Sequence, residues 1–143
     1  MIGRRHKCAG LAGTEDQIQA AVCLHLTIRA MPGVVWFHVP NGGSRTAAEA
    51  GRFKALGVKA GVPDLLAVRA GKLFALELKA PNGRLSEVQR EMLAKLSAAG
   101  AETAVAFGLD EALSRLTSWG LLRGSAISGL NERHAIGGRD GAR

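Results

Sequence analysis

Residues 63–79 read PDLLAVRAGKLFALELK, and this stretch decides the fold. Two runs rich in strand-forming residues, 64–68 and 73–79, flank the turn signal Arg69-Ala70-Gly71-Lys72. Apolar runs of this length on either side of a short glycine-containing turn are typical of a β-hairpin. The sequence therefore predicts two antiparallel strands here.

The second strand of this hairpin carries charge in an apolar setting. Side chains two apart share a face of a strand, so Glu77 and Lys79 emerge side by side. An ionised group in an apolar strand is costly unless it is paired or binds a metal. Antiparallel pairing brings Asp64 to the same end of the hairpin. Two carboxylates this close suit a hard divalent cation such as Mg²⁺, and the Leu78 carbonyl could add a ligand.

Such a triad favours phosphodiester hydrolysis. A metal held by Asp64 and Glu77 can polarise a phosphodiester and lower the pKa of bound water. Lys79 can orient that water or neutralise charge that develops on the phosphoryl oxygens. Simpler interpretations stay open at this point. Glu77 and Lys79 could form a solvated ion pair on an edge strand, and Asp64 could be a loop residue after proline.

The rest of the chain places the hairpin in an α/β fold. Four helices are expected from cap signals and helical spacing. Their ranges are about 15–30, 44–56, 86–99 and 110–119, and their expected caps are Thr14, Ser44, Ser86 and Asp110. Further strands are expected at 34–39 and 101–107. The order α-β-α-β-β-α-β-α predicts a central mixed β-sheet flanked by helices, with the second helix peripheral.

Other polar residues could join the hairpin site. Glu15 lies on the same helix face as Val22, so it could complete a metal site, although the helix dipole alone favours a first-turn Glu. Gln89 is either a capping-box partner or a hydrogen bonder in the active site. His38 and Asn41 could reach phosphate, although a lone histidine in an apolar strand is often structural.

Basic residues point to a polyanionic partner. Arg45, Arg52 and Lys59 could hold a nucleic-acid backbone, and a solvated basic face explains them equally well. The net charge is +7. Segments 1–13 and 121–143 supply five of these charges, so attraction to phosphate is expected in two arms, a flexible N-terminal segment and a disordered tail. Residues 14–120 are expected to form one domain.

The same composition bears on where the protein works. No apolar run is long enough to span a bilayer, and the first 13 residues lack a secretory hydrophobic region. Cys8 and Cys23 are the two thiols, and neither has metal-ligand spacing. A protein without membrane contact, in the cytoplasm of a bacterial or phage-infected cell, is expected.

Taken together, these motifs resemble the VRR-NUC family of the restriction-endonuclease-like PD-(D/E)XK superfamily, over about residues 14–120. The residues that carry the resemblance are Glu15, the Asn41-Gly42 turn, Gly61-Val62-Pro63-Asp64, Glu77-Leu78-Lys79, Gly83 and Gln89. The resemblance implies a restriction-endonuclease-like core and Mg²⁺ or Mn²⁺ bound by Asp64 and Glu77. It also implies a water assisted by Lys79 and a site completed by Glu15 and Gln89.

Stand-alone members of that family, from phages and bacteria, look like homodimeric, structure-specific nucleases similar to Holliday-junction resolvases. The resemblance thus implies a DNA endonuclease, with branched DNA as a candidate substrate and a homodimer as its working form. Two alternatives remain. One is a non-catalytic DNA-binding module that keeps the nuclease fold, and the other is a toxin-like or RNA-directed nuclease.

Overall fold

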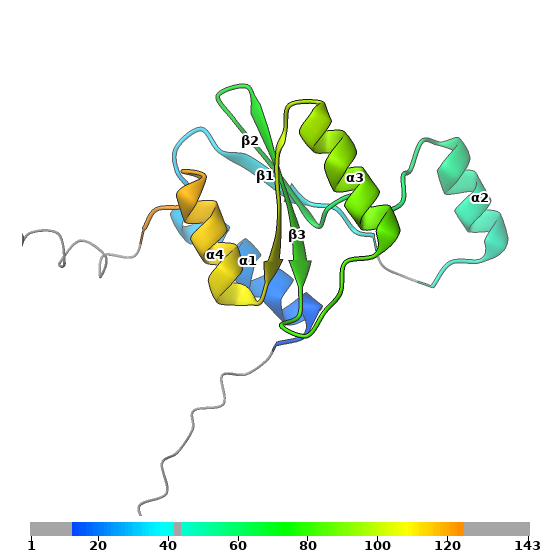
Figure 1. Cartoon of the computed structure of the whole chain (residues 1–143), viewed down its shortest axis with the longest axis horizontal. Helices are drawn as coiled ribbons and strands as arrows, with labels where there is room; N and C mark the ends of the chain where they lie inside the picture. Colours follow the sequence, from blue (N-terminus) through cyan, green and yellow to red (C-terminus); the bar gives the residue numbers. More distant parts are fainter. Residues whose placement is uncertain (1–12, 42–43, 125–143) are drawn as a thin grey trace, which may run out of the picture.

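The computed structural model describes residues 13–41 and 44–124 (Figure 1). The expected basic segment lies outside the described residues except for Gly13, and so does the expected tail from residue 125 onward. Gly42 and Gly43 of the predicted turn also lie outside them.

The helices and strands follow the predicted order. They are α1 (Glu15–Arg29), β1 (Val35–His38), α2 (Ala47–Ala55), β2 (Leu65–Arg69), β3 (Lys72–Lys79), α3 (Glu87–Ala98), β4 (Glu102–Phe107) and α4 (Leu109–Ser118). The sheet order is β1-β2-β3-β4, with β1, β2 and β3 antiparallel in turn and β3 parallel to β4. The parallel pair follows from α3, which carries the chain back across the sheet. The predicted mixed sheet is confirmed.

The predicted hairpin forms β2 and β3. Leu65 pairs with Leu76, and the turn residues Ala70 and Gly71 have φ of 50° and 77°. Two successive residues with positive φ give the turn a twist that matches that of the strands. Because β4 pairs with the other side of β3, the strand with the charged residues lies inside the sheet.

Helices cover both faces of the sheet (Figure 1). On one face, α1 packs against β3 and α4 against β4, and the core cluster there includes Leu65, Leu76 and Leu78, each 1% exposed. On the other face α3 packs against β4 and buries Leu93, and its Gln89 reaches Glu77 on β3. The alternation along β3 therefore sends Leu76 and Leu78 into this core and Glu77 and Lys79 to the face of α3.

Two expected caps are wrong. Thr46, not Ser44, caps α2, because its hydroxyl accepts from the Glu49 amide while the Glu49 carboxylate accepts from Thr46. The sequence already contains the pattern of this capping box, Thr46 followed three residues later by Glu49. Gly108 rather than Asp110 is the N-cap of α4, and Asp110 lies in its first turn.

The domain extends past the expected boundary at residue 120. Leu121 and Leu122 are 0% and 2% exposed and belong to the core cluster. The Leu121 carbonyl accepts from the Met31 amide, and Leu122 bridges to Ala30 at the end of α1. The first residues of the expected tail are therefore part of the packed fold.

Helix α2 stands apart from this core, as expected. It buries no side chain, and Figure 1 shows it beyond α3 at one end of the molecule. Among the described helices, no segment combines the length and apolar character that crossing a membrane requires.

Candidate active site

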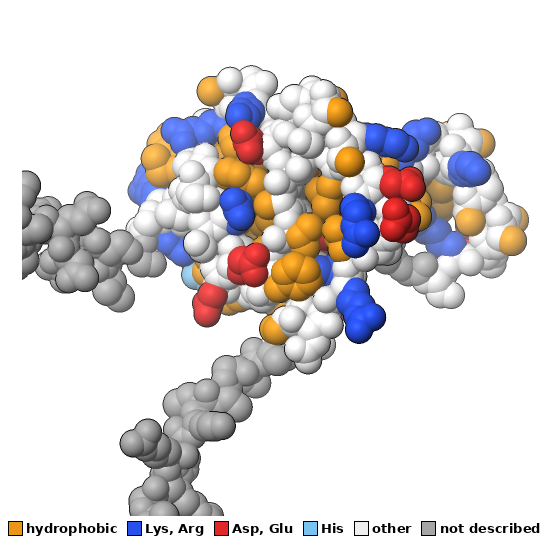
Figure 2. Space-filling view, in the orientation of Figure 1, with side chains coloured by type: hydrophobic (Ala, Val, Ile, Leu, Met, Phe, Trp, Pro, Cys, Tyr) orange, Lys and Arg blue, Asp and Glu red, His pale blue; other side chains and the backbone are white. Residues whose placement is uncertain are grey.

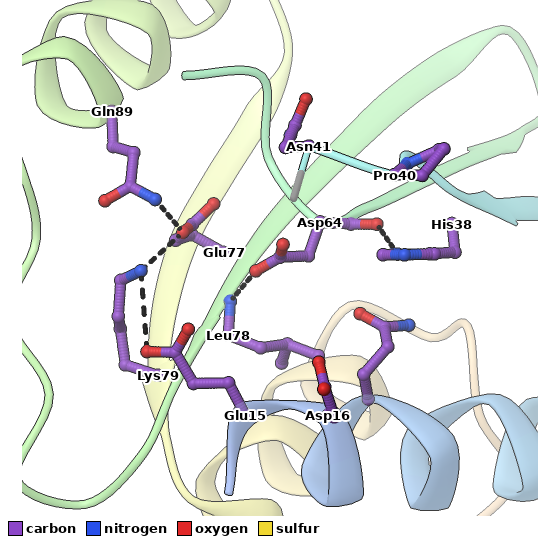
Figure 3. A pocket seen from close by; sticks show the side chains of 11 residues that line it. Glu15, Asp16, His38, Pro40, Asn41, Asp64, Glu77, Leu78, Lys79 and Gln89 are labelled. Atoms are coloured by element: carbon purple, nitrogen blue, oxygen red, sulfur yellow. Dashed lines mark hydrogen bonds and ion pairs between the residues drawn. The ribbon is translucent and has the colours of Figure 1, made fainter. Parts of the chain in front are cut away.

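The predicted catalytic residues meet at one cleft of about 500 Å³, formed where β1, β2, β3, α1 and α3 converge (Figure 3). The predicted residues that line it are Glu15, His38, Asn41, Asp64, Glu77, Leu78, Lys79 and Gln89. Asp16, Gln19 and Pro40 also line it and were not predicted. Gln19 lies one turn after Glu15, so its helical spacing was the signal that could have found it.

Asp64 is fixed at the start of β2. Its Oδ2 accepts a hydrogen bond from the Leu78 amide at 2.9 Å, which ties the carboxylate to the neighbouring strand. Its own carbonyl accepts from the Val39 amide at 2.8 Å. The aspartate is half-buried and lines the cleft, where its carboxylate can accept further bonds (Figure 3).

Glu77 and Lys79 form a buried ion pair. The Lys79 Nζ lies 2.9 Å from Glu77 Oε1, and the two residues are 5% and 1% exposed. Because β3 is an interior strand, the interpretation as a solvated ion pair on an edge strand is wrong. Glu15 reaches the same ammonium from α1, with its Oε1 3.7 Å from Nζ and its side chain half exposed.

Gln89 serves both roles that the sequence left open. Its Oε1 accepts from the Ser86 amide at 2.9 Å, which closes the capping box of α3. Its Nε2 donates to Glu77 Oε1 at 2.5 Å. The cap fixes the orientation of the amide, so the N-terminus of α3 presents a hydrogen-bond donor to the site.

One oxygen of this cluster has no partner. Glu77 Oε2 is buried and forms no hydrogen bond within the described part of the chain. An unpartnered buried carboxylate oxygen is costly, which suits a cation ligand. No three His, Cys, Asp or Glu side chains of the described residues converge tightly enough to hold a metal alone. A cation here would therefore use two carboxylates, other oxygens and water.

The electrostatics of the cleft agree with this view. Burial raises the pKa of Asp64, and the Leu78 amide and Lys79 only partly oppose it. Burial likewise raises the pKa of Glu77, and the nearby Asp64 carboxylate adds to the effect. Both anions are thus less stable than in water, and a cation between them would relieve this cost.

Lys79 responds in the opposite sense. Burial acts to lower its pKa, but the hydrogen bond and charge of Glu77, together with Glu15 and Asp64, outweigh burial and raise the pKa above its ordinary value. The ammonium form is therefore favoured in the cleft.

His38 and Asn41 close the cleft on the side of β1 and have structural contacts there. The His38 Nδ1 donates to the Asp64 carbonyl at 2.7 Å, so Nε2 is the ring nitrogen left for a ligand. The Asn41 Nδ2 donates to the Val62 carbonyl. Both residues brace the loop before Asp64 and line the cleft at the same time (Figure 3).

The basic residues expected near the site are divided. Arg45 and Lys59 do not line this cleft but line a second groove beside α2, which shares Asn41 with it. Arg52 lies on α2 and lines neither. Their expected contact with a nucleic-acid backbone stays a prediction.

A close packing contact holds the loop before Asp64 against α3. Gly61 has φ of 75°, and a Cβ at this position would lie 2.6 Å from the Val88 carbonyl oxygen. Only glycine allows this approach. The contact places Asp64 and Gln89, from separate elements, on one cleft.

Fold and site together define a nuclease-type α/β domain, with a carboxylate pair and a lysine at the end of a mixed sheet. The sequence profile of the VRR-NUC domain matches residues 14–109. A solved structure described as a VRR_NUC domain protein is 27% identical, with a TM-score of 0.63 over 75% of this chain and 88% of that chain. No curated protein matches the chain. The chain belongs to the VRR-NUC family of nuclease domains.

Proposed function

We propose that this protein is a metal-dependent DNA endonuclease that hydrolyses phosphodiester bonds in the cleft of Figure 3. The observation that carries the proposal is the buried Glu77 Oε2, which has no hydrogen-bond partner among the described residues and lies in one cleft with Asp64 and Lys79. A pure binding site for DNA has no need of two destabilised carboxylates, because they repel phosphate.

Asp64 and Glu77 are the residues that would hold Mg²⁺ or Mn²⁺, with Glu15 and the Leu78 carbonyl as further oxygen ligands. This set fits a hard cation, since Mg²⁺ takes one or two carboxylates and keeps several waters. When bound, such an ion polarises the phosphodiester and makes water a better nucleophile.

The chain's own residues would position the reactants. Lys79 would donate hydrogen bonds to the attacking water or to the phosphoryl oxygens, where negative charge grows. Gln89 is a positioning residue because it holds Glu77 Oε1 in place. In the reaction the water oxygen bonds to phosphorus and the water gives up a proton, while the bond to the leaving sugar oxygen breaks and that oxygen takes up a proton.

Branched DNA is the substrate and a homodimer the working form that we propose. A two-fold dimer presents two clefts to a four-way junction, whose two halves are related by the same symmetry. An apolar surface on β1 and β2 supports self-association, because Val35, Phe37 and Val68 are 65%, 48% and 38% exposed. Exposed apolar residues on one sheet face often mark an interface.

Cleavage of a labelled four-way junction, a linear duplex and single-stranded DNA, each in Mg²⁺, Mn²⁺ or chelator, tests the activity. We expect cutting only with metal, fastest on the junction, and its loss in Glu77→Gln. Glu102→Gln is the matched control, since Glu102 is an exposed glutamate on β4. If the wild type cuts nothing in either metal yet binds DNA in chelator, the proposed nuclease activity is wrong and the protein is a non-catalytic DNA-binding module.

Light scattering tests the dimer. Phe37→Asp should give the mass of a single chain, whereas Leu24→Asp, at a 59% exposed position on α1, should not change the mass. A wild type that is monomeric at assay concentration would exclude the paired arrangement.

A further inference from the structure

A second groove, of about 450 Å³, lies between α2 and the segment 58–61. It adjoins the catalytic cleft, because Asn41 lines both. Gly61 also lines the groove and lies two residues before the Pro63-Asp64 pair in the sequence. The groove is therefore next to a strand whose phosphodiester lies in the cleft.

The charge of the described chain is concentrated at this groove. Residues 44–60 hold four Lys or Arg and one acidic residue, whereas the other described residues hold nine of each. Figure 2 shows basic side chains gathered over α2 at the right of the view. All net positive charge of the described residues thus comes from this short segment.

The groove itself is lined by Arg45, Lys54 and Lys59, and none of the described residues that line it is acidic. The one acid of the segment, Glu49, is engaged in the capping box of α2. Within the described residues none of the three cations forms an ion pair. Their charge is therefore available to a ligand.

An aromatic contact orders one of these cations. The Arg45 guanidinium carbon lies 4.5 Å from the centre of the Phe53 ring. Stacking holds the guanidinium in one plane and leaves its N–H groups free at the edge, the arrangement that suits phosphate oxygens. Phe53 is thus a positioning residue for Arg45.

We propose that this groove binds the sugar–phosphate backbone of the nucleic-acid strand next to the phosphodiester held in the catalytic cleft. The proposal rests on the proposed function and adds the path of the strand to it. A cationic lining without acids favours a polyanion over a second copy of this chain as the occupant. Contacts to phosphate alone would make this binding independent of sequence.

Salt dependence of DNA binding tests the groove. Binding of a fluorescent duplex is measured in chelator between about 50 and 200 mM NaCl. Lys54→Ala/Lys59→Ala should reduce the slope of log affinity against log salt by about 2, since each lysine contact to phosphate contributes about 1. Lys95→Ala/Arg115→Ala removes the same charge from α3 and α4 and should keep the wild-type slope. Lys54→Arg/Lys59→Arg should keep it as well.

The proposal for the groove is overturned if the two double alanine variants have equal salt slopes, or if the wild type binds no DNA. Loss of dimer mass together with binding in Lys54→Ala/Lys59→Ala would also overturn it and make the groove a contact between two copies. Because binding is measured without divalent cation, a wild type that binds but never cuts contradicts only the nuclease. If the salt slope of Lys54→Ala/Lys59→Ala is not reduced while the wild type still cuts DNA, only the proposal for the groove is contradicted.

Discussion

Removal of the Lys79 ammonium should expose the cost of the buried Glu77 carboxylate. Glu77 is 1% exposed in the wild type, and in Lys79→Met the Gln89 amide would be its remaining side-chain donor among the described residues. Breaking a buried pair by removing one partner typically costs about 3 to 5 kcal/mol. The cost has a ceiling, however, because the glutamate can take up a proton instead.

That ceiling depends on pH. The ordinary pKa of glutamate is 4.5, so proton uptake costs at most about 3.4 kcal/mol at pH 7 and about 0.7 kcal/mol at pH 5. The folded-state pKa of Glu77 is raised above its unfolded value. The stability that this shift adds to the folded protein is therefore fully present below the unfolded pKa and is lost as pH rises through the folded pKa. We expect Lys79→Met to lose about 2 to 3 kcal/mol at pH 7 and under about 1 kcal/mol at pH 5.

Urea unfolding followed by tryptophan fluorescence, in chelator at both pH values, measures this loss. The control is Lys72→Met on the same strand, whose pair with Glu102 is 2.8 Å long but about half exposed. A surface pair of this kind is worth about 0 to 1 kcal/mol. Glu77→Gln/Lys79→Met should return to within about 1 kcal/mol of wild type, since both charges are gone. A Lys79→Met protein that is as stable as wild type at pH 7, or equally destabilised at both pH values, would refute the reasoning.

Three further changes test other parts of the structure. Gly61→Ala should cost at least about 1 kcal/mol more than Gly71→Ala in urea unfolding, because both have positive φ but only Gly61 faces the Val88 carbonyl. Gly61→Ala should also slow DNA cleavage. An unchanged cleavage rate would mean that the loop before Asp64 accommodates the extra methyl group without moving Asp64. Leu121→Ala should cost about 2 to 5 kcal/mol by thermal unfolding, against under about 0.5 kcal/mol for the exposed Leu24→Ala. Mg²⁺ at 100 times its Kd should stabilise the wild type by about 2.7 kcal/mol in urea, whereas an equal gain in Glu77→Gln would place the ion elsewhere.

Much of the fold follows from local signals. The capping boxes at Thr14 and Ser86 and the Ala70-Gly71 turn act within a few residues, so the sequence predicted α1, α3 and the hairpin. Where the cap prediction was wrong, as at α2, a second capping residue stood close by. The packing of Leu121 lay beyond local signals because α1 and α4 supply its partners.

The sequence by itself determined which residues share a strand face and one end of the hairpin, since the two-residue period and the antiparallel turn are local properties of the chain. It could thus bring Asp64, Glu77 and Lys79 together. Only the tertiary structure decided that β4 pairs beside β3 and that α3 covers this face, which buries the ion pair and brings Gln89 to Glu77. Strand order and helix packing depend on contacts between residues far apart in the chain. The local periodicity of apolar residues in the sequence does not predict such contacts.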